Sequence, residues 1–154
     1  MILRILKSNN QRNLILFPVI GILFWAKSLL FPFSYDFYPG ENANLLFLPL
    51  YNIIHNWPFF QVFLSYILVI TLAFFIQFLN DRYSFIRIRT KLPATIFVAV
   101  IAGFTELHTL HPVFLSALFL MFGIYNLFGT FEQKKPYSKI FNAGFFVGIG
   151  SIFY

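Results

Sequence analysis

Three acidic residues lie in segments that contain no lysine or arginine, and they are the first candidates for chemistry in this sequence. Asp36 and Glu41 fall in one turn-rich segment, and Glu106 falls in a second segment much farther along the chain. Carboxylates can act as general bases, and they can accept hydrogen bonds from the hydroxyl groups of a substrate. Asp36, Glu41 and Glu106 are therefore candidates for a catalytic or substrate-binding role.

Lys27 joins these candidates because it stands inside an apolar stretch, apart from the other basic residues. An ionisable group at such a position is a functional hypothesis by default. The simpler explanation is that its long side chain reaches a polar region at the end of the stretch. The alternative is that Lys27 pairs with one of the three acids around an anionic lipid group.

His108 and His111, close to Glu106, are the residues that most resemble metal ligands. On a helix the two histidines could share a face, but Glu106 would point elsewhere and Pro112 disfavours helical geometry at His111. The chain has no cysteine, which removes thiolate ligands and nucleophiles. We therefore expect no metal and no cofactor, and we interpret the histidines as polar loop residues that titrate near neutral pH.

The distribution of the basic side chains indicates which segments of the chain position these residues. Apolar types make up 59% of the chain, charged types 10%, and the mean hydropathy is +0.77, whereas soluble domains are about one quarter charged. The net charge is +6, and apolar stretches separate the basic residues from one another. This separation favours anionic lipid headgroups over nucleic acid as the partner of the basic residues. The basic residues form three clusters: Arg4, Lys7 and Arg12; Arg82, Arg87, Arg89 and Lys91; and Lys134, Lys135 and Lys139.

The pattern predicts an all-α integral membrane protein, built as a single polytopic domain. A membrane span requires about 20 mainly apolar residues. About five stretches qualify or nearly do: residues 13–33, 58–80, 92–107, 112–131 and 140–154. Two further segments are predicted at the membrane surface: a helix at residues 1–11 on the inner leaflet, and an interfacial or re-entrant helix at residues 45–57 outside. Because basic residues collect in cytoplasmic loops, we expect a bacterial inner-membrane protein whose N-terminus is cytoplasmic.

Small residues in the last apolar stretch indicate close helix packing. Gly144 and Gly148 lie four residues apart, a spacing that lets two helix backbones approach closely in a membrane. The sequence leaves open whether the neighbouring helix belongs to the same chain or to another. Asn126, in the preceding stretch, is expected to form an interhelical hydrogen bond.

Two segments, residues 111–128 and 141–154, resemble an uncharacterised family of bacterial multi-pass inner-membrane proteins, sometimes mislabelled as carotene monooxygenases. The basic start and Leu92-Pro93 are similar too. The resemblance implies a multi-pass fold, and it implies no catalytic residues. It matches only the N-terminal half of the family. We therefore expect either that the chain is the N-terminal part of a longer protein, or that helices packed on Gly144 and Gly148 shield its end.

Asp36 also resembles the acid that multi-pass glycosyltransferases using lipid-linked sugars carry in their first external loop. These enzymes are much longer and carry further site residues. The first functional hypothesis is instead a non-catalytic subunit or assembly partner of a larger inner-membrane complex for secretion or envelope building. The external segments look too short for an enzyme pocket, and intramembrane charge is sparse. The alternative is an enzyme or carrier that acts on polyprenyl-linked sugars at the outer face, using Asp36, Glu41, Glu106 and Lys27.

Overall fold

The computed structural model describes residues 15–37, 44–86 and 90–154, and every regular element in these ranges is helical. This confirms the predicted all-α class. The predicted surface helix at residues 1–11 lies outside the described residues. In chain order the elements are α2 (Leu16–Leu30), α3 (Phe47–Ile54), α4 (Pro58–Tyr83), α5 (Leu92–Ala102), the 3-10 turn η3 (Thr105–His108), α6 (Pro112–Phe128), the 3-10 turn η4 (Gly129–Glu132) and α7 (Tyr137–Phe153).

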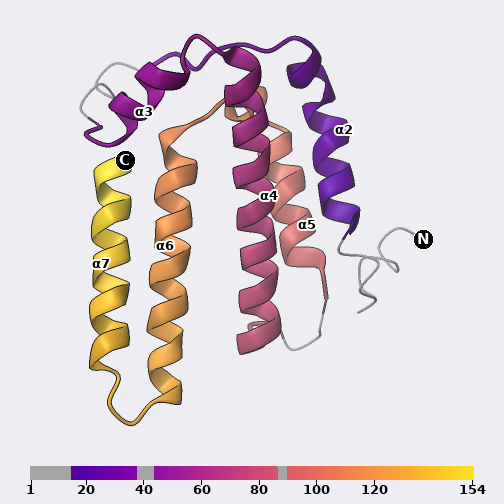
Figure 1. Cartoon of the computed structure of the whole chain (residues 1–154). Helices are drawn as coiled ribbons and strands as arrows, with labels where there is room; N and C mark the ends of the chain where they lie inside the picture. Colours follow the sequence, from indigo (N-terminus) through magenta and orange to yellow (C-terminus); the bar gives the residue numbers. More distant parts are fainter. Residues whose placement is uncertain (1–14, 38–43, 87–89) are drawn as a thin grey trace.

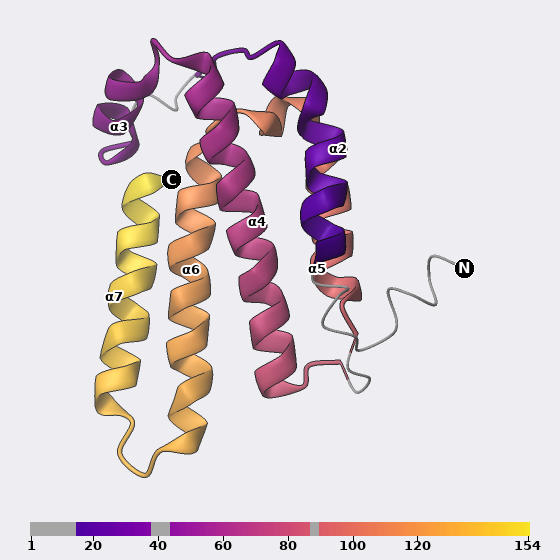
Figure 2. The ribbon, with the colours of Figure 1, turned by 45° about the vertical axis from the view of Figure 1, so that its right-hand side comes forward.

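Helix α4 lies at the centre of the bundle (Figures 1 and 2). It packs against α2 and α5 on one side and against α6 on the other, and α6 pairs in turn with α7. The turns that follow α4 and α6 lie at one end of the bundle, which we call the basic end. Residues 31–37, α3 and η3 lie at the other end (Figure 1). There the backbone N–H of Leu46 donates to the carbonyl oxygen of Ile152 at 3.5 Å, joining the start of α3 to the end of α7.

Two helical stretches within the described ranges are long and apolar enough to cross a membrane: Pro58–Tyr83 with 26 residues, and Pro112–Glu132 with 21. They correspond to the predicted spans 58–80 and 112–131. The other helices are shorter, with 15 residues in α2, 11 in α5 and 17 in α7. At 1.5 Å per residue, each of them falls short of the roughly 30 Å hydrocarbon core. The remaining three predicted spans therefore stay predictions.

The predicted span 92–107 differs most from the structure. Helix α5 ends at Ala102, and Phe104 is extended, with φ −103° and ψ 102°. The chain then forms η3 and turns back into α6. His111 is extended, at φ −92° and ψ 139°, as expected for a residue that precedes proline. The turn before Pro112 is thus confirmed, but it begins several residues earlier than the sequence indicated.

Proline residues begin the two helical stretches that are long enough to cross a membrane. Pro58 and Pro112 occupy the first turns of α4 and α6, where a missing N–H group leaves no helical hydrogen bond unmade. Helix α4 ends at Tyr83 and is followed by Ser84, whose φ of 51° is left-handed and whose N–H donates to the carbonyl oxygen of Asn80 at 2.9 Å. The chain therefore leaves α4 at a defined point and turns back towards α5.

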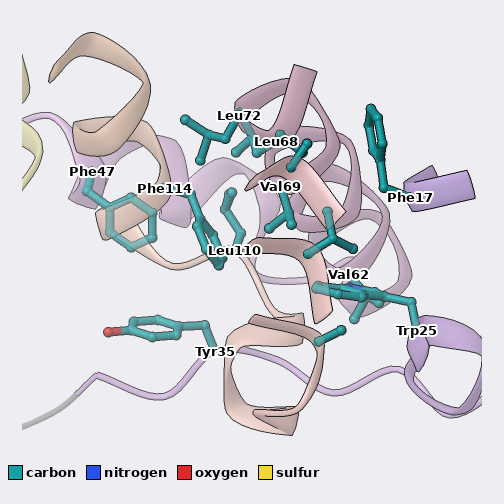
Figure 3. Packing of buried hydrophobic residues seen from close by; sticks show 14 residues of the cluster. Phe17, Trp25, Tyr35, Phe47, Val62, Leu68, Val69, Leu72, Leu110 and Phe114 are labelled. Atoms are coloured by element: carbon teal, nitrogen blue, oxygen red, sulfur yellow. The ribbon is translucent and has the colours of Figure 1, made fainter. Parts of the chain in front are cut away.

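The core lies between α2, α4, α5 and the turn that carries η3. Trp25 and Phe17 point from α2 into this core, and both are fully buried (Figure 3). Gly21 lets α2 approach its neighbours, because a Cβ atom at this position would lie 3.1 Å from Tyr66 and 3.2 Å from Ile70. Helix α2, which leads into residues 31–37, is therefore packed closely against α4 and α5.

Candidate functional site

A cleft of about 290 Å³ opens where the segment after α2 meets the segment between α5 and α6. It unites Asp36 with Glu106, two of the acids singled out in the sequence, and both side chains are exposed. The loops were expected to be too short for a pocket, but two of them combine to form one. We call this site the acidic cleft; it is lined by Phe33, Ser34, Tyr35, Asp36, Phe37, Glu106, Leu107, Thr109 and His111.

Tyr35 anchors one wall of the acidic cleft. Its backbone N–H donates to Gln61 Oε1 at 3.1 Å, and its carbonyl oxygen accepts from Tyr51 Oη at 3.0 Å. The Tyr35 ring is buried and meets the ring of His111 edge to face, with centroids 5.0 Å apart. These contacts hold Asp36 in place although it lies in no helix.

Gln61, which was not among the candidates from the sequence, is almost fully buried near the start of α4. Its Nε2 group also donates to the carbonyl oxygens of Ile54 and His55, both at 3.4 Å. A glutamine in an otherwise apolar helix was the available signal, because polar groups in such helices turn towards protein partners. Ser65 follows the same rule one turn later and donates to the carbonyl oxygen of Leu107 at 3.1 Å.

His108 connects the other wall of the acidic cleft, formed by the segment between α5 and α6, to α2. The side chain is 1% exposed, with Nδ1 2.7 Å from Ser28 Oγ and Nε2 3.1 Å from the carbonyl oxygen of Ala102. A carbonyl oxygen can only accept, so Nε2 carries the proton and Ser28 donates to Nδ1. Trp25 stacks on the ring at a centroid distance of 4.0 Å. Both ring nitrogens are thus engaged in fixing the turn that bears Glu106.

Burial lowers the pKa of His108 below its ordinary value of 6.5, and the hydrogen bond to Ala102 opposes this only in part. The unfolded chain therefore takes up a proton at a higher pH than the folded protein does. Above about pH 6.5 both states are neutral and the contribution of His108 to stability is complete. As the pH falls below that value, stability declines until the pH reaches the lower pKa of the folded state.

We expect the melting temperature of the purified protein to fall as the pH is lowered from about 8 to about 5, and to fall less in His108→Gln. The matched control is His55→Gln, because His55 is exposed and its loss should leave the wild-type slope intact. Thermal melts of the three proteins across this pH range measure the effect. An equal slope in His108→Gln and the wild type would show that another group titrates.

The structure separates the two histidines that were considered as metal ligands. His108 is engaged as described above, whereas His111 lies at the start of α6 and its Nδ1 accepts from the Val113 N–H at 3.3 Å. Within residues 15–37, 44–86 and 90–154, no group of three or more His, Cys, Asp or Glu side chains is placed to hold a metal ion.

The structure does not place the other two candidate site residues, Lys27 and Glu41, in the acidic cleft. Lys27 is in the last turn of α2, with an exposed side chain that is absent from the cleft lining. Glu41 lies outside the described residues. The structure thus brings together Asp36 and Glu106 and adds His111 to them.

Ion pairs join the elements at the basic end. Arg82 meets Glu132 at 2.8 Å and also donates to Tyr125 Oη at 3.0 Å, which connects the end of α4 to α6 and η4. Lys91 is buried and meets Asp81 at 2.8 Å. The described residues of the second and third basic clusters therefore share one end of the bundle, opposite the acidic cleft (Figure 1). They are Arg82, Lys91, Lys134, Lys135 and Lys139.

The structure gives Gly144 and Gly148 no packing partner among the described residues. A Cβ atom at either glycine would meet nothing within 4 Å, so the described part of the chain leaves this face of α7 open, and packing against another chain stays a prediction. Gly123 and Gly150 form the close contact between α6 and α7 instead. The amide of Asn126 donates to the carbonyl oxygen of Phe122 at 2.8 Å, a hydrogen bond within α6 rather than between helices.

Comparison with known protein families, with curated proteins and with solved structures finds no match to this chain. The class of protein is therefore defined by its architecture. It is a helical bundle with two helices long enough to span a membrane, an acidic cleft at one end, and ion-paired basic residues at the other.

Proposed function

We propose that this chain is a multi-pass protein of the bacterial inner membrane, with its basic end in the cytoplasm and the acidic cleft at the outer face. The outward surfaces of the bundle support this location. Large apolar side chains are exposed on α2, α4, α6 and α7, including Leu23 (70%), Phe63 (43%), Leu127 (52%) and Phe141 (73%). Exposed apolar side chains on four helices suit a lipid environment. The separation of cations from the cleft acids supports the orientation.

Cysteine labelling tests the orientation. The chain contains no cysteine of its own, so only an introduced cysteine can be labelled. Ser84 and Ser138 lie at the basic end, and Asn52 lies on α3; all three are exposed. An impermeant thiol reagent should label Asn52→Cys in intact cells, and should label Ser84→Cys and Ser138→Cys only after permeabilisation. Labelling of Ser84→Cys in intact cells would reverse the orientation.

We further propose that the acidic cleft binds the sugar part of a polyprenyl-linked sugar at the outer membrane face. The observation that carries this proposal is the meeting of Asp36 and Glu106 in one cleft with the rings of Phe33, Tyr35 and Phe37. Carboxylates accept hydrogen bonds from sugar hydroxyl groups, and apolar walls with a few convergent polar groups are typical of small-molecule sites. This observation favours the enzyme or carrier hypothesis over that of a purely structural subunit.

The chemistry open to such a site is general-base catalysis. A carboxylate within hydrogen-bond reach of an acceptor hydroxyl group can remove its proton as the hydroxyl oxygen attacks the anomeric carbon of the sugar. The new glycosidic bond forms as the bond from that carbon to the phosphate oxygen breaks, and the polyprenyl phosphate carrier leaves with the bonding electrons. Asp36 and Glu106 are the two groups that fill this role in the proposal. The described residues of the cleft lining include no lysine or arginine, so the sugar, and not the phosphate of the carrier lipid, is the part that we propose the cleft holds.

Binding to protein in lipid nanodiscs tests this proposal. The probe is a polyprenyl-diphosphate-linked N-acetylhexosamine, and the same lipid without the sugar is the reference. We expect the sugar-bearing lipid to bind more tightly, and Asp36→Asn or Glu106→Gln to weaken its binding by about tenfold or more, which corresponds to about 1.4 kcal/mol. Glu132→Gln, at the opposite end, is the matched control. Equal binding of both lipids, or unchanged binding in the cleft variants, would exclude the sugar site.

A second candidate function is assembly with another membrane protein. It is favoured by the face of α7 that carries Gly144 and Gly148, which no other part of the described chain covers. Exposed Phe141 and Phe145 flank these glycines. Small residues at this spacing suit the close approach of a helix from another chain. The two functions are compatible, because this face and the acidic cleft are different surfaces.

A further inference from the structure

A groove of about 370 Å³ lies between α4, α5 and α6, towards the basic end. It is separate from the acidic cleft and shares no lining residue with it. Apolar side chains line almost all of it: Ile76, Leu79, Asn80, Phe85, Ile86, Pro93, Met121 and Ile124. The volume is within the range of roughly 300–1,000 Å³ that is typical of small-molecule sites.

The groove forms because α5 is much shorter than α4. At 1.5 Å per residue, 11 residues give α5 a length of about 16 Å, whereas 26 residues give α4 about 39 Å. Helix α5 therefore covers only part of α4 (Figure 2). Phe85 and Ile86, just after the end of α4, line the groove. The Ile86 N–H donates to Asn80 Oδ1 at 3.1 Å and fixes this segment beside the groove. Among the described lining residues Asn80 is the only one with a polar side chain, and this bond occupies its oxygen.

A tyrosine at the end of α4 carries a hydroxyl group without a hydrogen-bond partner. The hydroxyl oxygen of Tyr83 is buried and makes no hydrogen bond. Tyr83 is not a lining residue of the groove, but it follows the lining residues Leu79 and Asn80 by one helical turn, so it lies on the same side of α4. Its ring contacts Phe85 of the groove lining, with centroids 6.1 Å apart, and Phe128 of α6 at 5.2 Å. A buried hydroxyl group without a partner is costly, so an oxygen atom that reached Tyr83 would gain a hydrogen bond.

The charge at this end of the bundle points to the same kind of ligand. The described residues at the basic end include five cations (Arg82, Lys91, Lys134, Lys135 and Lys139) and two acids (Asp81 and Glu132), a net charge of +3. An anionic amphiphile has three parts: a hydrocarbon chain, ester or phosphate oxygens, and a negative headgroup. The apolar groove suits the hydrocarbon chain, the unsatisfied hydroxyl donor suits the oxygens, and the positive end of the bundle suits the headgroup.

We propose that the groove holds one acyl chain of an anionic phospholipid from the adjacent leaflet, and that a phospholipid oxygen accepts the hydrogen bond of Tyr83. Moving the hydrocarbon chain from the bilayer into the groove lowers its free energy only a little, because lipid tails are as apolar as the groove. The hydroxyl group and the positive basic end therefore provide the selectivity. The proposal rests on the proposed membrane location, but not on the acidic cleft or on its sugar ligand.

Two variants and two matched controls test the lipid site. Ile124→Trp fills the groove, whereas Leu127→Trp places the same side chain on the exposed, outward face of α6. Tyr83→Phe removes only the hydroxyl group, whereas Tyr137→Phe removes one from an exposed tyrosine at the same end. Each protein is extracted in mild detergent, reconstituted in nanodiscs of phosphatidylglycerol and phosphatidylethanolamine, and released for native mass spectrometry.

We expect the wild type and both controls to retain one phosphatidylglycerol per chain, Ile124→Trp to lose it, and Tyr83→Phe to retain a smaller fraction. A melting measurement on each variant checks that it is folded, and Tyr83→Phe gives an answer even where Ile124→Trp does not fold. Retention in Ile124→Trp equal to the wild type, or equal retention of the two phospholipids, would overturn the proposal. The cysteine-labelling experiment reports separately on the membrane location, so the two failures can be distinguished.

Discussion

Replacing Trp25 with alanine is expected to lower the free energy of unfolding by about 3–5 kcal/mol, the largest effect of any single substitution considered in this chain. Trp25 is fully buried, stacks on His108 at 4.0 Å and meets Tyr66 edge to face at 6.0 Å. Its removal leaves a cavity between α2, α4 and the turn that bears Glu106. Because the same turn forms one wall of the acidic cleft, binding of the sugar probe should weaken as well. Unfolding of the protein in mixed micelles, followed by circular dichroism, measures the first effect.

The matched control is Trp57→Ala, since Trp57 is 68% exposed. Its replacement should change the free energy of unfolding by no more than about 0.5 kcal/mol. If Trp25→Ala and Trp57→Ala lowered the free energy of unfolding equally, the contact of Trp25 with His108 would not hold α2 to the turn.

Gly123→Leu is expected to destabilise the protein by about 1–3 kcal/mol or more, the second-largest effect. A Cβ atom at Gly123 would lie 3.0 Å from Val147 Cγ2 and 3.3 Å from the carbonyl oxygen of Ala143. The side chain of Val147 can adjust, but the backbone of α7 cannot move away without separating the two helices. A thermal melt of the purified protein measures this loss.

Gly144→Leu, alone or with Gly148→Leu, is the control for Gly123 and also tests assembly. A Cβ atom on either glycine would meet no atom of the described chain within 4 Å. These substitutions should therefore leave the melting temperature of the isolated chain unchanged. If this face of α7 binds another membrane protein, the double variant should reduce the size of the complex extracted in mild detergent. An unchanged complex would count against assembly through this face, and a lower melting temperature would show that the two glycines pack within the chain.

The packing of the helices was the part of the fold least accessible from the sequence. In a soluble helix the apolar stripe marks the buried face, but here α2, α4, α6 and α7 carry apolar residues all round. Gly144 and Gly148 therefore looked as suitable for packing as Gly123 does. The structure buries Gly123 and leaves the other two exposed. Polar residues were the better guide, because Gln61, Ser65 and Gln77 of α4 are all buried.

The sequence by itself determined the helical class, the starts of α4 and α6 and the turn before Pro112, because these depend on composition and on the geometry of proline and its neighbour. It also identified Asp36 and Glu106 as candidates from their positions outside the basic clusters. Only the tertiary structure decided that these two acids share a cleft. Their meeting depends on hydrogen bonds and ring contacts made across the chain, by Gln61 to Tyr35 and by Ser28 and Trp25 to His108. Such contacts join residues far apart in the sequence, and no local pattern specifies them.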